Sequence, residues 1–161
     1  MMQTEEIEIA VAKFLNLKAN IIVPNVRYGM DFQHECDIFM ITKSGYGYEV
    51  EIKISKQDLM RDFKKKNGHK SNKIGRLFYA MPEYMEDCIS LIPEYAGILI
   101  AKRCDGKVEC YKVRNAKKTS SYRFTEKEQM HLARLGTMRI WKLKKLINAI
   151  QTEAEMMEIV K

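Results

Sequence analysis

The chain has 161 residues, a formal net charge of +7 and a pI of about 9.2. This length suits one domain with its own core, and the balance of 46% hydrophobic and 30% charged residues excludes wholesale disorder. The positive charge favours an acidic partner, of which nucleic acid is the commonest and an anionic membrane surface is the alternative.

The N-terminus and the cysteines bear on location. The chain begins Met-Met-Gln-Thr-Glu-Glu, which is acidic where a signal peptide is basic. No apolar run approaches the roughly 18 residues that cross a bilayer. The four cysteines form no C-x-x-C pair, so we expect reduced thiols. These features predict a cytoplasmic protein that does not associate with membranes.

The first part of the chain predicts a helix followed by three strands. Thr4 can cap a helix that reaches about Leu17, with an apolar stripe along one side. Strands are expected at residues 21–28, 36–42 and 48–54, the last two as a hairpin. Pro24 indicates that the first strand lies at an edge or contains a bulge.

The middle of the chain continues with alternating elements. Residues 55–58 match a capping box, which predicts a helix directly after the third strand. Further elements are expected as strands at 77–81, 96–101 and 108–113 and a short helix at 83–91. Asp105-Gly106 is the strongest hairpin-turn signal in the chain.

From Thr125 onward the pattern is helical, and a second capping box spans Thr125 to Glu128. Gly136 is expected to divide this stretch into two helices. We therefore predict a single domain over residues 1–161, with a core at about 4–113 and a helical extension at about 124–160. The order of elements predicts an α/β fold with a mixed central sheet.

Two short segments contain acidic residues and a lysine that could form a reactive site. Asp37 lies near the start of one predicted hairpin strand, and Glu51 and Lys53 lie near the end of the other. Because side chains alternate along a strand, Glu51 and Lys53 share a face with Glu49. In the hairpin, Asp37 near the start of one strand can lie opposite the end of the other strand, which brings Asp37, Glu51 and Lys53 together. His34 and Cys36 make a poor metal site by themselves, so we interpret them as packing residues.

Such a cluster suits a metal-dependent reaction on phosphate. Two carboxylates and a main-chain carbonyl can hold Mg²⁺, which neutralises phosphate charge and lowers the pKa of a bound water. Lys53 can position that water and stabilise developing negative charge. The alternative is an ordinary half-exposed strand, because alternating charged and apolar residues are common in sheets.

The basic stretch after the cluster favours the chemical interpretation. Residues 53–76 hold nine Lys or Arg against two Asp, a local charge of +7. A solvated helix face is the alternative, but this run begins at the predicted site and can follow a phosphate backbone. The residues proposed for nucleic-acid contact are Lys56, Arg61, Lys64, Lys65, His69, Lys70 and Lys73. A surface histidine without such a role is the alternative for His69.

These residues resemble the motif of a known family. Asp37…Glu51-Ile52-Lys53 resembles the signature of the PD-(D/E)XK nuclease superfamily, with Cys36 in place of its proline. The segment 48–59, followed by 75–82, resembles the MmcB-like DNA-repair endonucleases, and the similarity runs from about residue 34 to 113. The resemblance implies a restriction-endonuclease-like core of helix, three-stranded meander, helix and strand.

The resemblance also implies a site. It assigns Mg²⁺ or Mn²⁺ to Asp37, Glu51 and the backbone carbonyl of Ile52, with Lys53 as the catalytic lysine and DNA as substrate. Many members add a glutamate from the first helix. Glu5, Glu6 and Glu8 are available, and Glu6 is favoured because it borders the apolar face.

Three functions follow from the sequence as hypotheses. The first is a metal-dependent DNA endonuclease that hydrolyses phosphodiester bonds in repair or in a mobile element. The second is a nucleic-acid-binding module that keeps the fold without cutting. The third is a nuclease subunit that needs a protein partner, docked through the C-terminal helices. An exposed apolar stripe on residues 132–147 would support this third function, and a stripe packed on the sheet would weaken it.

Overall fold

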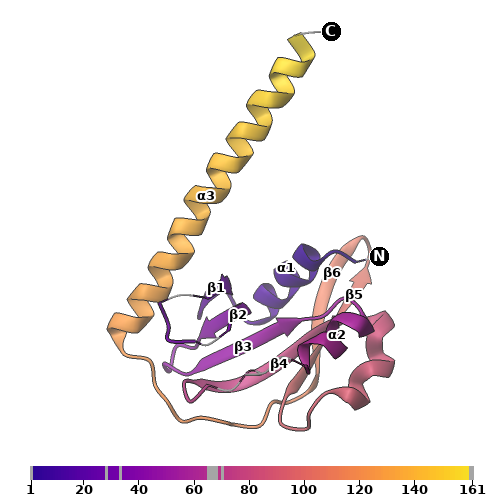
Figure 1. Ribbon diagram of the computed structural model, residues 1–161, viewed down its shortest axis with the longest axis vertical. Coiled ribbons are helices and arrows are strands. Elements are labelled where there is room, and N and C mark those ends of the chain that lie inside the picture. Colours follow the sequence, from indigo (N-terminus) through magenta and orange to yellow (C-terminus); the bar gives the residue numbers. More distant parts are fainter. Residues whose placement is uncertain (1, 28, 33, 65–68, 70, 160–161) are drawn as a thin grey trace.

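A computed structural model describes residues 2–27, 29–32, 34–64, 69 and 71–159, without the side chains of 155–159. It is an α/β fold with a six-stranded mixed sheet and a long C-terminal helix (Figure 1). The elements are α1 (Thr4–Phe14), β1 (Ile21–Val26), β2 (Cys36–Ile41), β3 (Gly47–Ile52), α2 (Lys56–Asp62), β4 (Ile74–Pro82), the 3-10 helix η1 (Glu83–Leu91), β5 (Gly97–Cys104), β6 (Lys107–Arg114) and α3 (Glu126–Ile159).

The strands lie in the sheet in chain order, from β1 to β6. The β3–β4 and β4–β5 pairs are parallel, and the other pairs are antiparallel. β1 is an edge strand, as Pro24 predicts. Asp105 and Gly106 both have positive φ, the conformation of the tight turn that their sequence predicts between β5 and β6.

Helices cover both faces of the sheet. Ile7 and Val11 of α1 pack on one face, against a cluster that includes Val50 of β3. Leu59 of α2 packs on the opposite face with residues of β4, β5 and η1. The elements at 4–14, 56–62 and 74–82 thus enclose the end of β3, which is where the predicted site lies (Figure 1).

The start of α1 differs from the expectation. Thr4 is the first helical residue, and Gln3 is the cap: its backbone N–H donates to Oε2 of Glu6 at 2.9 Å. Thr4 fails as a cap because Glu6, three residues beyond Gln3, completes the capping arrangement one residue earlier. The expected cap of α2 is confirmed, since Ser55 Oγ accepts a hydrogen bond from the backbone of Asp58.

Helix α3 is one continuous helix of 34 residues, so the expected break at Gly136 is wrong. A Cβ at Gly136 would lie 3.2 Å from Cγ2 of Val23 in β1. Glycine is therefore suited to a close approach of helix and strand here, and the helix continues through it. Leu132, just before this contact, is fully buried.

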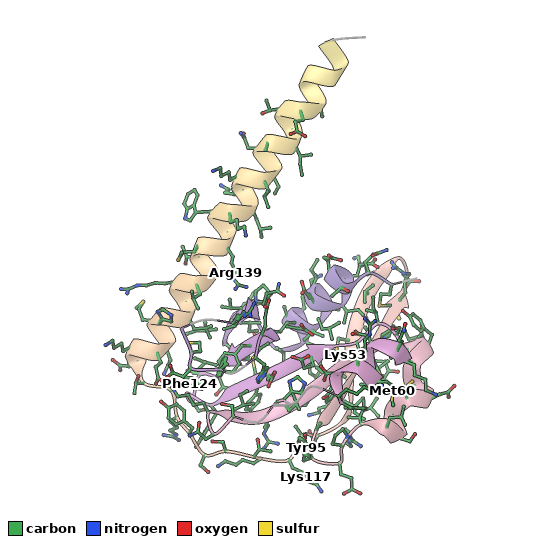
Figure 2. All side chains as sticks on the ribbon, in the orientation of Figure 1. Lys53, Met60, Tyr95, Lys117, Phe124 and Arg139 are labelled. Atoms are coloured by element: carbon green, nitrogen blue, oxygen red, sulfur yellow. The ribbon has the colours of Figure 1, made fainter. Side chains whose placement is uncertain are left out.

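Beyond Gly136 the helix projects away from the sheet (Figure 1). Arg139 still reaches β1, since its guanidinium donates to the backbone carbonyl of Asn25, and further along the helix the side chains extend into open space (Figure 2). The large apolar side chains exposed there are Met138, Ile140, Trp141, Leu143, Leu146, Ile147 and Ile150. Within the described residues, no helix combines the length and apolar character needed to cross a membrane.

Candidate functional site

The β2–β3 hairpin brings Asp37 to Glu51. Ile38 pairs with Val50, so Asp37 and Glu51 are neighbours across the two strands. Oδ2 of Asp37 accepts a 2.8 Å hydrogen bond from the backbone N–H of Ile52, which fixes this carboxylate beside the end of β3. Glu51 is almost fully buried, whereas about a third of the Asp37 side chain is exposed. The expected convergence of these residues is therefore present.

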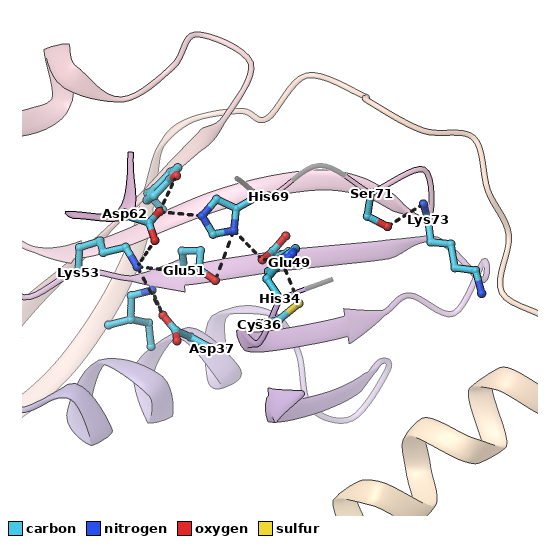
Figure 3. A network of polar contacts seen from close by, with 12 residues as sticks. His34, Cys36, Asp37, Glu49, Glu51, Lys53, Asp62, His69, Ser71 and Lys73 are labelled. Carbon is cyan, nitrogen blue, oxygen red and sulfur yellow. Dashed lines mark hydrogen bonds and ion pairs between the residues drawn. The ribbon is translucent and has the colours of Figure 1, made fainter. Parts of the chain in front are cut away.

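Lys53 lies at the centre of the carboxylates (Figure 3). Its Nζ is 2.8 Å from Oε2 of Glu51, 3.3 Å from Oδ1 of Asp62 and 3.9 Å from Oδ2 of Asp37. Burial opposes the charge on this amine, but the surrounding carboxylates outweigh it, so the pKa of Lys53 is raised. Lys53 is therefore a fixed cation at neutral pH, which suits charge stabilisation better than proton abstraction.

Asp62 is a member of the cluster that the sequence did not indicate. It lies at the end of α2, almost fully buried, and accepts a 3.1 Å hydrogen bond from the hydroxyl of Tyr79 in β4. The oxygen that accepts this bond is Oδ2, and Nε2 of His69 lies 2.7 Å from the same atom. Asp62 therefore connects Lys53 to His69 and ties α2 to β4.

Glu49 extends the network along β3. It shares a face with Glu51, as strand alternation predicts, and is fully buried. Its Oε1 lies 2.5 Å from Nε2 of His34 and 3.0 Å from Nδ1 of His69. Cys36 Sγ lies 3.7 Å from Nε2 of His34. His34 and Cys36 therefore belong to the polar network, and the interpretation of both as packing residues is wrong for His34.

The network holds more acids than fixed cations. Burial, reinforced by the nearby charge of Asp37, raises the pKa of Glu51 to about 7. Burial opposes protonation of His69, but hydrogen bonds to Asp62 and Glu49 outweigh it and raise its pKa to about 10. Oε1 of Glu51 and Oε2 of Glu49 are buried and have no hydrogen-bond partner among the described residues. Buried carboxylate oxygens of this kind favour a bound cation.

Among the residues that the structure describes, two groups of side chains have the spacing to hold a metal ion. One contains Glu49, Glu51 and His69, and the other contains His34, Cys36 and Glu49. Within each group the potential ligand atoms lie within 4.8 Å of one another. This region therefore has side chains that could hold a metal ion, and Glu49 belongs to both groups.

A cavity of about 470 Å³ opens beside the cluster, bordered by Asp37, Lys53 and the backbone region of Ile52. Its first-helix carboxylate is Glu8, not the expected Glu6. Glu6 instead bonds to the backbone of Gln3 and pairs with Arg103 at 2.7 Å, and these contacts lower its pKa. Burial and the charges of Glu5 and Asp37 raise the pKa of Glu8, as expected for a carboxyl beside the site.

The basic residues proposed for nucleic-acid contact separate into groups. Lys56, Arg61 and Lys64 are exposed, and Arg61 borders the cavity. The side chain of His69 is only 5% exposed and is bonded within the carboxylate network, so the alternative of a surface histidine is wrong. Lys73 is paired with Asp31 and Glu128 at 2.9 and 3.0 Å. The remaining two, Lys65 and Lys70, lie outside the described residues.

A second cavity, of about 850 Å³, continues from the first toward α3. The two cavities share Glu8 and Asn25 in their walls. Arg27, Arg139 and Lys142 line the second one. A basic wall thus borders the approach to the carboxylate cluster, and no sequence pattern indicated it because Arg27 and Arg139 lie over one hundred positions apart.

No protein-family model matches the chain, and no curated protein does. Among solved structures, the chain is similar to the SPO1766 protein of unknown function from Silicibacter pomeroyi. The two share 16% sequence identity with a TM-score of 0.63, and the alignment covers 94% of each chain. At this identity the similarity shows a shared fold and carries no activity with it.

Proposed function

We propose that this protein is a Mg²⁺- or Mn²⁺-dependent DNA endonuclease with a restriction-endonuclease-like core. The observation that carries the proposal is the convergence of Asp37, Glu51 and Lys53 beside one open cavity, which Asp37 and Lys53 line. The three come from β2 and from the end of β3, the strands of a meander that is preceded by α1 and followed by α2 and β4. This order agrees with the resemblance noted from the sequence.

The residues present fit a divalent cation. Glu51 keeps one buried oxygen without a hydrogen-bond partner, and Asp37 presents a carboxylate to the cavity. These two carboxylates, with the carbonyl of Ile52, would hold the ion, which supplies charge neutralisation at phosphate and a more acidic bound water. Lys53 lies beside both carboxylates and stabilises negative charge that develops on the phosphate.

Positive charge around the cavity supports a nucleic-acid substrate. Arg61 borders the cavity itself, and Lys56 and Lys64 are exposed on the same helical segment and the turn after it. Arg139 and Lys142 approach from α3 on the other side. Phosphate contacts from both sides would hold a strand across the carboxylates without reading its bases. Structure or backbone recognition is therefore favoured over strict sequence specificity.

The test is cleavage of labelled single-stranded, duplex, nicked and branched DNA with Mg²⁺, Mn²⁺ or EDTA. Asp37→Asn and Lys53→Met should abolish metal-dependent cutting, while Lys102→Met, which removes an exposed lysine paired with Glu83, should retain it. Salt-sensitive DNA binding without cutting in the wild type would instead favour a non-catalytic binding module.

A further inference from the structure

The inference concerns the end of the polar network that lies away from Lys53. There, side chains from the segment before β2, from β2, from β3 and from the connection after α2 meet around Glu49 (Figure 3). We propose that His34, Cys36, Glu49 and His69 form a site for a transition-metal ion such as Zn²⁺, separate from the Mg²⁺ ligands. The proposal does not depend on nuclease activity.

The distances support a single ion. Cys36 Sγ and His34 Nε2 are 3.7 Å apart, and Glu49 Oε1 is 2.5 Å from His34 Nε2 and 3.0 Å from His69 Nδ1. Metal–ligand bonds of about 2.0–2.3 Å in tetrahedral geometry put neighbouring ligand atoms about 3.3–3.7 Å apart. Three of the four donors, those of His34, Cys36 and Glu49, already lie within 4.8 Å of one another, and His69 joins them through its contact with Glu49.

The hydrogen bonds orient His69 as a ligand. Its Nε2 faces Asp62 Oδ2 at 2.7 Å, so this nitrogen carries a proton and Nδ1 is directed at Glu49. A carboxylate that holds the far nitrogen of a metal-binding histidine is the usual outer partner of such a site. Glu49 supplies an independent sign of a missing cation, because it is fully buried and its Oε2 has no partner among the described residues.

The types of ligand atom at this site indicate which metal ion it would bind. A thiolate, two imidazoles and one carboxylate match Zn²⁺ or Co²⁺, whereas Mg²⁺ prefers oxygen ligands. Asp37 and the Ile52 carbonyl offer oxygens only, and Asp37 lies toward Lys53, whereas His34 and Cys36 lie toward Glu49 (Figure 3). The network therefore presents two chemically distinct ends.

Co²⁺ titration of the full-length protein tests the proposal, because a Co²⁺–thiolate bond gives a near-ultraviolet charge-transfer band. We expect one equivalent to bind with that band, and Cys36→Ser to remove it. Cys88→Ser, which changes a buried cysteine in the apolar cluster around Leu59, should leave it unchanged. Asp62→Asn should weaken Zn²⁺ binding by about 10- to 100-fold in calorimetry.

The same titration decides against the proposal if Co²⁺ binds without a charge-transfer band, or if His34→Gln and Cys36→Ser both bind Zn²⁺ as tightly as wild type. Circular dichroism of each variant verifies that it is folded. Since none of these measurements uses DNA, failure of this proposal and failure of the nuclease proposal are distinguishable.

Discussion

The ammonium nitrogen of Lys53 lies 2.8 Å from Oε2 of Glu51, at a point where both side chains are almost fully shielded from water. Asp62 and Asp37 lie within 4 Å of the same nitrogen. One buried cation thus compensates several buried acids. Removing it should therefore have a large effect on stability as well as on activity.

Lys53→Met should lower the free energy of unfolding in EDTA by about 3–5 kcal/mol, because it leaves buried carboxylates without their cation. Chemical denaturation at neutral pH measures the loss. The matched change Lys102→Met breaks an exposed ion pair with Glu83 and should cost less than about 1 kcal/mol. Equal losses in the two variants would contradict the central position of Lys53.

Tyr79→Phe should lower the free energy of unfolding by about 1–3 kcal/mol. Its buried hydroxyl donates to Asp62 Oδ2, and deletion of the hydroxyl removes one partner of a buried carboxylate. Tyr84→Phe is the control, because the exposed Tyr84 hydroxyl donates to the carbonyl of Ile54. Thermal or urea unfolding of both variants should show a clearly larger loss for Tyr79; a reversed order would refute the predicted role of the hydroxyl.

Gly47→Ala should destabilise the protein by about 1–3 kcal/mol through overpacking. A Cβ at this position would lie 2.6 Å from Cε2 of Phe124 and 2.8 Å from Cζ of Phe39, with the carbonyl oxygen of Lys73 at 3.2 Å. Urea unfolding gives the value. Gly136→Ala is the comparison: its Cβ meets only Val23, at 3.2 Å, and alanine favours the helix by about 1 kcal/mol. Gly47→Ala should therefore be the less stable of the two.

Glu128→Gln should destabilise the protein at neutral pH by about 2 kcal/mol, a typical value for hydrogen bonds to a charged group. Burial opposes the charge of Glu128, but hydrogen bonds from Thr125, Tyr122 and Lys73 outweigh it and lower its pKa to about 2. The ordinary pKa of a glutamate side chain is 4.5. Since the folded-state pKa is depressed, this contribution is present above pH 4.5 and is lost as the pH falls toward 2.

The pH dependence is measured by urea unfolding of wild type and Glu128→Gln between pH 3 and pH 7. The difference between the two proteins should shrink below about pH 4.5. A difference that stays constant across this range would show that the carboxylate charge contributes nothing, and that Glu128 stabilises the start of α3 by packing alone.

Local signals predicted the elements that depend on neighbouring residues. Ser55 caps α2 and Asp105-Gly106 forms the β5–β6 turn, because both depend on contacts within a few positions. The predicted helix break at Gly136 was wrong because it rested only on the low helix propensity of glycine. The reason for a glycine at this position is its close contact with Val23, which lies over one hundred residues away in the sequence. Packing against β1 outweighs the propensity.

The same distinction separates the predicted and missed parts of the site. Asp37, Glu51 and Lys53 were predictable because a hairpin and strand alternation relate them. Asp62 and His69 join them only through the crossover between the parallel strands β3 and β4. The choice between Glu6 and Glu8 depended on Arg103, which attracts Glu6 from β5. No short-range pattern contains that information.

The match between strand order and chain order has a consequence for how the molecule is made. Each new strand joins the edge left by the one before it, so no segment has to be inserted between two strands that are already paired. His34 to Tyr79 contains the whole polar network, and this stretch is synthesised before β5, β6 and α3. A growing chain can therefore bring the network together early, and the later strands extend the sheet beyond β4 as they emerge from the ribosome.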